Sequence, residues 1–386
     1  MNAERRPRIV HWHLGPVFEL SENWLYRQFI LLKRYDYLYY SLGRINRGLF
    51  PDERIRALAE SGTGLRALNR LLRLFRDDFL PIRLWLRRDR PALVHAHFGT
   101  GGYWAMRHIS GACPLVVSFY GADAYVFDRS PEWLANYRSL FGRGALFLAE
   151  GPAMAGKLAS LGCPVGKIRI HPVGIQTELY RFAPRGIDTG SAIRLLVVGR
   201  FVEKKGIPFA VQALRLVRRR FAEATLTIVG GAPENPAGRR EQAQIMAAIR
   251  EGGLEAHVRL EGWLAPDSLQ RLADDHHILL VPSVFAADGD AEGGHPVILT
   301  EMMARGLAVA AFDHCDINQA VVDGMTGLLA PMKDVAALAA AICRLAEDAP
   351  GRERMGRAAR RHVEERYDLG KLNERLEDYY EELLEK

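Results

Sequence analysis

The segment from 288 to 314, DGDAEGGHPVILTEMMARGLAVAAFDH, holds the residues best suited to chemistry. A glycine-rich loop leads to Pro296, which suits the first turn of a helix, and Gly306 suits the end of that helix. Residues 297–300 would then present free backbone N–H groups at a helix N-terminus. Such a terminus is a ready-made site for phosphate.

Two carboxylates accompany this predicted phosphate site. Glu301 lies on the same short helix, where its natural partner is the pair of vicinal hydroxyls of a ribose, because a carboxylate does not bind phosphate. Glu292 lies upstream in the glycine loop and can reach a different hydroxylated group. The alternative is that both are surface carboxylates that bind nothing.

A second candidate lies in VVGRFVEKKG, residues 197–206, where a strand ends at Val198 and a glycine turn follows. Arg200 and Lys205 then emerge before a helix. Cations at the carboxyl end of a parallel strand face the ligand crevice. A planar guanidinium and a point-charge ammonium suit a diphosphate, whereas we expect Lys204 to face solvent.

Other polar clusters have simpler interpretations. Asp288 and Asp290 look like a metal-binding acidic pair, but we favour a role in shaping the loop. The run DDHH at 274–277 directly precedes a buried strand and is interpreted as a helix end. His95 and His97 alternate on one strand and share a face. His97 either reaches an interdomain cleft or is a hydrogen-bonded structural histidine.

The elements that must position these residues follow a repeating pattern of apolar strands separated by helices, which indicates parallel sheets covered on both faces. The first series of strand-like runs is 8–14, 92–98, 113–121 and 144–151. The second series is 193–200, 224–231, 258–264, 277–283 and 307–313. Two series predict an α/β fold of two doubly wound, Rossmann-like domains. We place them at 1–180 and 190–367, with a linker at 176–192 and a C-terminal helix, 368–386, that returns to the first domain.

Composition excludes several classes of protein. The chain has 386 residues, of which 48% are hydrophobic and 25% charged, so general disorder is excluded. No apolar run is long enough to span a membrane, and no secretory signal is evident. The four cysteines are scattered, which fits a reducing cytoplasm without a disulfide framework or a zinc site.

The net charge of +6 is unevenly distributed. Residues 1–190 hold 27 Lys and Arg against 16 Asp and Glu, whereas residues 191–386 hold 25 against 30. A basic first half favours an anionic partner, namely nucleic acid, a membrane surface or a phosphorylated substrate, unless the arginines are merely solvated. Nucleic acid is not expected, because the arginines lack aromatic interleaving.

One basic helix stands out at 64–90. Arg66, Arg70 and Arg73 share one face, and the opposite face is apolar, formed by Leu65, Leu68, Leu72 and Phe75. A helix of this kind can lie on an anionic membrane surface. The alternative is that its leucine face packs on the sheet.

Together these motifs resemble the retaining glycosyltransferases of family 4, which have the GT-B architecture of two domains facing a cleft. The second-domain pattern carries the resemblance most specifically: GR, KG, and then the two-glutamate loop with a proline before a helix. In the first domain, SENWLYRQF (21–29), VHAHFG (94–99) and SFYGAD (118–123) look like the branch that builds exopolysaccharide and colanic-acid-type surface glycans. The resemblance implies a nucleotide-sugar donor in the second domain, an acceptor on the first, and no bound metal or other cofactor.

The resemblance also assigns residues. It implies that Arg200 and Lys205 neutralise the donor diphosphate, that Glu301 holds the ribose and that Glu292 serves the transferred sugar. The expected donor-binding set is Gly199, Arg200, Lys205, Gly230, Trp263, Gly293, Gly294, His295, Pro296, Val297, Ile298 and Glu301. The expected acceptor and cleft set is Gly15, His97, Tyr120 and Asp123.

Three positions depart from the family pattern. Glu292 is four steps before Pro296 instead of three, so that Gly293 occupies the expected position. Either the loop bulges to return Glu292 to the sugar, or a backbone group replaces it. Tyr120 stands where many relatives have His, and DINQA (316–320) replaces a common Pro-Glu pair.

The function implied is transfer of a hexose-type sugar from a UDP- or GDP-sugar to a lipid-linked glycan, in the cytoplasm or peripherally on the inner face of the cell membrane. One alternative is a nucleotide-sugar epimerase on the same fold. The other is a catalytically silent assembly partner, which the displaced Glu292 motivates.

Overall fold

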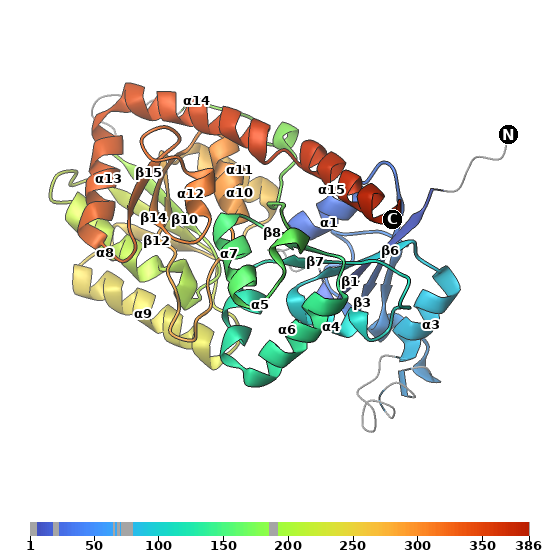
Figure 1. The fold of residues 1–386 in the computed structure, drawn as a ribbon. Coiled ribbons are helices and arrows are strands. Elements are labelled where there is room, and N and C mark those ends of the chain that lie inside the picture. The colour runs from blue at the N-terminus through green and yellow to red at the C-terminus, as the bar shows by residue number, and fades with distance from the viewer. Residues whose placement is uncertain are drawn as a thin grey trace. The chain divides into compact units, whose positions relative to one another are not determined.

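The computed structural model describes residues 6–17, 23–64, 66, 67, 70, 80–184 and 192–385. Within them the chain forms two compact units, one of residues 1–174 with 369–386 and the other of residues 175–368. Each unit contains a parallel β-sheet covered by helices (Figure 1). No helix in the described ranges has both the length and the apolar character needed to cross a membrane.

The sheet of the first unit has seven parallel strands in the order β5-β3-β1-β6-β7-β8-β9. Its strands are β1 (Arg8–His13), β3 (Asp36–Ser41), β5 (Ile55–Ala57), β6 (Leu93–His97), β7 (Leu115–Phe119), β8 (Leu146–Ala149) and β9 (Ile168–Ile170). A small separate sheet pairs β2 (Pro16–Val17) with β4 (Gly43–Arg44). The helices of this unit are α1 (Asn23–Ile30), α3 (Leu80–Asp89), α4 (Gly99–Met106), α5 (Ala122–Tyr125), α6 (Pro131–Arg143), α7 (Pro152–Ser160) and α15 (Leu369–Leu384).

The sheet of the second unit has six strands in the order β12-β11-β10-β13-β14-β15, all parallel. They are β10 (Arg194–Val198), β11 (Thr225–Val229), β12 (Val258–Glu261), β13 (Ile278–Val281), β14 (Ala308–Asp313) and β15 (Leu328–Pro331). The helices are α8 (Ile207–Val217), α9 (Pro236–Gly252), α10 (Pro266–Asp274), α11 (Val297–Ala304), α12 (Ile317–Ala320), α13 (Val335–Glu347) and α14 (Ala349–Arg366).

Alternation along the strands explains how one sheet supports two layers of helices. On β10, Leu195 belongs to the core that α8, α9 and α13 cover, whereas Leu196 belongs to the core on the opposite face, beneath α11 and α14. Neighbouring side chains of a strand point to opposite faces, so a strand that is covered on both sides must be apolar at nearly every position. This is why the apolar runs of the sequence identify these strands correctly.

The segment after Gly174 corrects the predicted boundary. Ile175 donates its N–H to Tyr367 O at 2.8 Å, and Ala183 donates to Arg305 O at 3.1 Å, so residues 175–183 pack on the second unit. The prediction of a linker over 176–192 is therefore wrong for its first part, because the polar composition concealed a buried Tyr180. Residues 185–191 of that predicted linker lie outside the described residues.

Helix α15 belongs to the first unit and is anchored there by a buried carboxylate. Glu377 is 1% exposed and accepts the backbone N–H groups of Lys33 and Arg34, both at 2.6 Å, and the Arg34 side chain at 3.3 Å. Leu376 and Tyr380, on the same helix, pack on Ile9 and Val116 of the sheet. A charged acceptor buried among three donors stabilises more than an exposed ion pair does.

We expect Glu377→Gln to lower the free energy of unfolding of the first unit by about 1.5–3 kcal/mol, since hydrogen bonds to a charged acceptor contribute about that much. Calorimetric or denaturant unfolding measures this. Glu374→Gln is the matched control: Glu374 is on the same helix and pairs with Lys33 at 3.3 Å, but it is 62% exposed and should cost less than about 1 kcal/mol. Equal losses in the two variants would contradict the anchoring role.

Candidate nucleotide-sugar site

The second unit has its topological switch point at β10. From β10 the chain adds β11 and β12 on one side and then β13 to β15 on the other. Open α/β sheets bind ligands outside the carboxyl ends of the strands at such a point. A pocket lies there, lined by the carboxyl ends of β10 and β13 together with Lys205, Pro296 and Ile298. Of the residues singled out in the sequence, Lys205, Pro296 and Ile298 thus lie at the position that the topology favours.

Two glycines bring the loops after β10 and β11 into direct contact. Gly199 donates its N–H to Val229 O at 2.9 Å. Gly230 has φ +134°, and a Cβ there would lie 2.0 Å from Gly199 O, so no larger residue fits. Trp263 packs beside this contact, 49% exposed, with its Nε1 only 2.9 Å from where a Cβ on Gly231 would lie.

Arg200 follows directly on this contact and is half-buried. Its guanidinium has no hydrogen bond or ion pair with any described residue. It lies close enough to Lys205 to lower the pKa of that ammonium group. The loop therefore holds a cation at the carboxyl edge of β10 without neutralising it.

Lys205 and Glu292 form a buried ion pair, with Nζ 2.8 Å from Oε1 and 3.0 Å from Oε2. Ser283, at the end of β13, donates its hydroxyl to Oε1 at 2.8 Å. Burial on its own raises the pKa of Glu292, but the ammonium groups of Lys205 and Lys204 and these hydrogen bonds outweigh burial and lower the pKa to about 2. Burial lowers the pKa of Lys205, and Glu292 opposes that shift.

Lys204 does not face solvent, and that expectation is wrong. Its Nζ donates to Asp290 Oδ1 at 3.0 Å and to Ala291 O at 3.1 Å, and the residue is 9% exposed. Asp288 in turn accepts the N–H of Asp290 at 2.9 Å. The two aspartates and Lys204 thus fix the loop that presents Glu292, and no described side-chain grouping suited to a metal includes Asp288 or Asp290.

The loop reaches α11 through a bulge at Gly293, which has φ +80°. Gly294, His295 and Pro296 follow, all buried. His295 packs edge-on against Tyr367 at 4.7 Å between ring centroids, and burial lowers its pKa to about 4. The extra residue between Glu292 and Pro296 is therefore absorbed by a glycine turn, and Glu292 remains in the site.

Helix α11 begins after Pro296, and its first backbone N–H groups, those of Val297 and Ile298, are at the pocket end of the helix. One turn later, Glu301 Oε1 accepts the Tyr180 hydroxyl at 2.6 Å. Tyr180 comes from the segment taken for a linker, so the sequence gave no indication of this contact. Ser283 was missed for a similar reason, since a lone serine at a strand end carries no motif.

The run at 274–277 is a helix end. Asp274 pairs with Arg305, and His276 contacts Leu272 O at 2.7 Å and Thr227 Oγ1 at 2.8 Å. His277 Nδ1 accepts the N–H of Arg194 at 3.0 Å. These side chains face different partners.

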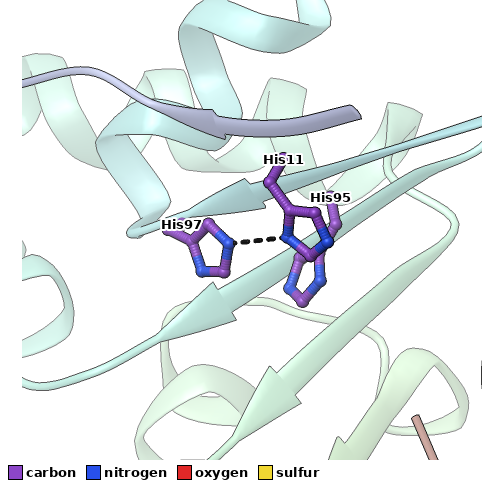
Figure 2. Close-up of side chains that lie close together, drawn as sticks. All are labelled: His11, His95 and His97. Atoms are coloured by element: carbon purple, nitrogen blue, oxygen red, sulfur yellow. Dashed lines mark hydrogen bonds between the residues drawn. The ribbon is translucent and has the colours of Figure 1, made fainter. Parts of the chain in front are cut away.

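The residues expected at the acceptor gather at the strand ends of the first unit, but His97 is not exposed. It is 1% exposed, and its Nε2 lies 3.0 Å from His11 Nδ1 (Figure 2). On its other side, His97 Nδ1 lies 2.8 Å from the Tyr120 hydroxyl. Of the two interpretations, the structural histidine is therefore correct. Tyr120 is half-buried, and Trp24 lies against its ring at 4.8 Å between centroids.

Asp123 and Gly15 shape loops in the same unit. Asp123 accepts the backbone N–H groups of Gly99, Tyr120 and Gly121 at 2.8–3.1 Å. Burial raises its pKa to about 6, against the effect of these hydrogen bonds. Gly15 donates its N–H to His13 Nδ1 at 3.0 Å just after β1. Asp123, 2% exposed, holds Tyr120 in place and does not itself reach the surface.

Comparison with known proteins agrees with this geometry. Residues 44–179 match the model of Glycosyltransferase Family 4, and residues 192–348 match that of Glycosyl transferases group 1. A putative colanic acid biosynthesis glycosyltransferase, WcaL of Escherichia coli, is 30% identical over 288 residues, which cover 73% of this chain and 68% of WcaL. The chain belongs to glycosyltransferase family 4.

A further relative of this family 4 member is the amylovoran biosynthesis glycosyltransferase AmsK of Erwinia amylovora, 34% identical over 256 residues. That match spans 65% of this chain and only 60% of AmsK. Among solved structures, sucrose-phosphate synthase from Thermosynechococcus elongatus superposes with a TM-score of 0.76 at 18% identity, covering 98% and 99% of the two chains. Anabaena HepE in complex with UDP and glucose gives 0.73 at 17% identity, covering 97% and 100%. These structures establish the GT-B fold of two Rossmann-like domains.

The depressed pKa of Glu292 predicts a pH-dependent contribution to stability. A carboxyl whose pKa falls from 4.5 to about 2 on folding stabilises the fold above pH 4.5, and this contribution disappears as the pH falls towards 2. By linkage it amounts to something on the order of 3 kcal/mol. Glu292→Gln should therefore be less stable than wild type at pH 7, and the difference should narrow on acidification.

Denaturant unfolding of the second unit between pH 7 and pH 3 measures this difference. Glu347→Gln is the control, because Glu347 forms an exposed ion pair with Arg220 at 2.8 Å. The control should stay close to wild type at every pH. A deficit of Glu292→Gln that did not change with pH would show that its charge is not what stabilises the loop.

Proposed function

We propose that this chain is a retaining glycosyltransferase that moves a hexose-type sugar from a UDP- or GDP-sugar to a lipid-linked glycan in bacterial surface polysaccharide synthesis. The observation that carries the proposal is the buried Lys205–Glu292 pair beside the first turn of α11, at the switch point of the second unit. The names of AmsK and WcaL, which refer to amylovoran and colanic acid, support the polysaccharide.

The proposed mechanism is mainly electrostatic. As the bond between sugar and diphosphate breaks, negative charge develops on the diphosphate, and Arg200, Lys205 and the first N–H groups of α11 stabilise it. Lys205 and these N–H groups are held in place by the fold before the nucleotide sugar binds, so little reorganisation of them is needed. Losing one such group typically lowers the rate by about 10²–10³-fold. With two cations and a helix terminus at the phosphates, we propose that the transfer uses no metal.

Glu292 has two roles in this proposal. Its carboxylate keeps Lys205 charged and fixed in a site where burial lowers the pKa of the ammonium group. Its position in the loop just before α11 also suits a hydrogen bond to a hydroxyl of the transferred sugar. The acceptor would lose its proton to the donor phosphate, because burial raises the pKa of Tyr120 far above neutrality and makes it a poor base.

A transfer assay distinguishes this function from its rivals. Purified protein is incubated with UDP- and GDP-hexoses and lipid-linked glycan acceptors, and NMR reads the anomeric configuration of the product. Acceptor-dependent product of retained configuration is expected. Rapid conversion of the donor to its epimer without acceptor would instead indicate an epimerase. Donor binding with neither transfer nor hydrolysis would indicate a silent assembly partner.

Glu301→Gln tests the ribose assignment. It should weaken binding of the nucleoside diphosphate by about 10–100-fold, since hydrogen bonds to a charged acceptor contribute about 1.5–3 kcal/mol. Isothermal titration with UDP and GDP measures the affinity, and circular dichroism checks the fold. Glu353→Gln, in an exposed pair with Arg357 at 2.6 Å, is the control. Unchanged affinity in Glu301→Gln would remove this residue from the site.

We further propose peripheral membrane association through the first unit, as a lipid-linked acceptor requires. Arg66 and Arg70 are exposed, whereas Arg73 and the apolar face of that segment lie outside the described residues. Binding to anionic vesicles should fall with added salt and with Arg66, Arg70 and Arg73 changed to Glu, because each basic side chain near the surface contributes about 1 kcal/mol.

Co-sedimentation with vesicles containing anionic lipid measures this association. The control changes three exposed arginines of the second unit, Arg344, Arg354 and Arg361, to Glu, which alters the net charge equally. If the wild type stays in the supernatant at low salt, the membrane proposal fails and a soluble acceptor is favoured. If both triple variants lose binding equally, the net charge of the protein and not Arg66, Arg70 and Arg73 in particular attracts the membrane.

A further inference from the structure

Three histidines lie together inside the first unit, whereas the proposed donor site belongs to the second (Figure 2). His11 comes from β1, and His95 and His97 come from the adjacent β6. None is more than 1% exposed. We propose that these imidazoles form a binding site for a transition metal ion of the zinc class, which would clamp the two central strands of this unit.

The donor atoms are close enough to share one ion. One ring nitrogen from each histidine can be chosen so that all three lie within 4.8 Å of one another. The shortest separation is the 3.0 Å between His11 Nδ1 and His97 Nε2. Nitrogens at about 2.0–2.1 Å from a tetrahedral zinc are about 3.3 Å apart, so modest rotations of the side chains would complete the site.

The outer nitrogens are held as metal-bound histidines commonly are. His97 Nδ1 lies 2.8 Å from the Tyr120 hydroxyl, and His95 Nδ1 lies 2.6 Å from the Tyr380 hydroxyl. Such partners fix the tautomer of a ligating imidazole and orient its ring, leaving Nε2 to the ion. Ser118 Oγ, 2.8 Å from His95 Nε2, is the neighbouring oxygen that could complete four-coordination.

The hydrogen bonds of this cluster satisfy only one of the two ring nitrogens of His11. One proton must lie between His11 Nδ1 and His97 Nε2, because the two nitrogens are at hydrogen-bond distance. If His11 donates this proton, its Nε2 is an acceptor without a donor; if His97 donates, His11 Nε2–H is a donor without an acceptor. His11 Nε2 is buried and has no partner among the described residues in either case.

Coordination would replace the hydrogen bond between His11 Nδ1 and His97 Nε2 with two bonds to the ion. The protons of His95 and His97 move to Nδ1 and are donated to the two tyrosines, and that of His11 moves to Nε2, so no net proton is released. His11 Nε2 then carries the proton and has no hydrogen-bond partner among the described residues, as in the protein without an ion. The carboxyl groups of Glu150 and Asp123, near enough to raise the pKa of Tyr120, would partly offset the charge of the ion.

The test measures metal content, independent of transferase activity. Protein produced with zinc supplementation is passed through chelating resin and analysed by mass spectrometry for metals. One zinc per chain is expected in wild type and a small fraction of that in His97→Gln. His276→Gln is the matched control, since His276 is a buried histidine of the second unit with both ring nitrogens bonded. It should retain the wild-type zinc content.

A second measurement does not depend on a variant that folds. Wild type is unfolded with chelator, refolded and titrated with Co²⁺, whose visible absorption reports nitrogen coordination of low symmetry. Saturation at one equivalent, reversed by zinc, is expected. Wild type that holds no zinc and gives no cobalt spectrum after refolding to its native circular dichroism would overturn the proposal, as would equal zinc content in wild type and His97→Gln.

Discussion

A buried ammonium–carboxylate pair, Lys205 with Glu292, joins two segments 87 residues apart in the sequence. Burying two charges is costly, and the cost is offset only when the geometry is good and other hydrogen bonds satisfy the remaining lone pairs. Here Ser283 supplies such a bond, and Lys204 donates to the backbone carbonyl of Ala291, the residue before Glu292. Removing one partner of such a pair typically costs about 3–5 kcal/mol, so moving the loop before α11 away from Lys205 would be strongly destabilising.

This constraint determines what the site can do. Glu292 offsets part of the positive charge of Lys205, and Arg200 is the cation of this site that has no partner among the described residues. Arg200 follows the point where Gly199 and Gly230 bring two loops into contact, and a Cβ on Gly230 would prevent this contact. Lys205 of the ion pair and the start of α11 line one pocket, and the glycine contact follows directly on the strand β10 that ends at this pocket. Electrostatic stabilisation of a leaving group depends on this kind of preorganisation.

The sequence predicts most of this arrangement, and its failures have physical reasons. Strands covered on both faces are apolar throughout, so β10 and β13 were evident, whereas β3, DYLYYS, was missed because tyrosines and an aspartate interrupt its apolar character. Glycine, proline and charge spacing identified Arg200, Lys205, Glu292 and Glu301. Lys204 was placed wrongly because a lysine beside another lysine carries no information about which side chain turns inward.

Contacts between distant segments were the least predictable. Tyr180 binds Glu301 from a segment whose polar composition suggested a linker, and Ser283 binds Glu292 from a strand end without a motif. His97 carried two interpretations because its environment depends on His11, which is 86 residues away and adjacent only through the pairing of β1 with β6. Strand order, which the local pattern does not contain, decided between them.

The two units differ in the chemistry of their strand ends, and this difference supports a division of labour. In the second unit, lysines, an arginine and carboxylates meet at the carboxyl ends of β10 and β13, which suits a charged diphosphate. In the first unit, neutral imidazoles and a tyrosine occupy the ends of β6 and β7, and their pKa values are shifted towards the uncharged forms. Of these groups, Tyr120 is only half-buried, and its neutral hydroxyl suits a hydroxyl of a glycan better than an anion. The proposed assignment of donor to the second unit and acceptor to the first therefore agrees with the charges of the two sites, without reference to how the units are arranged.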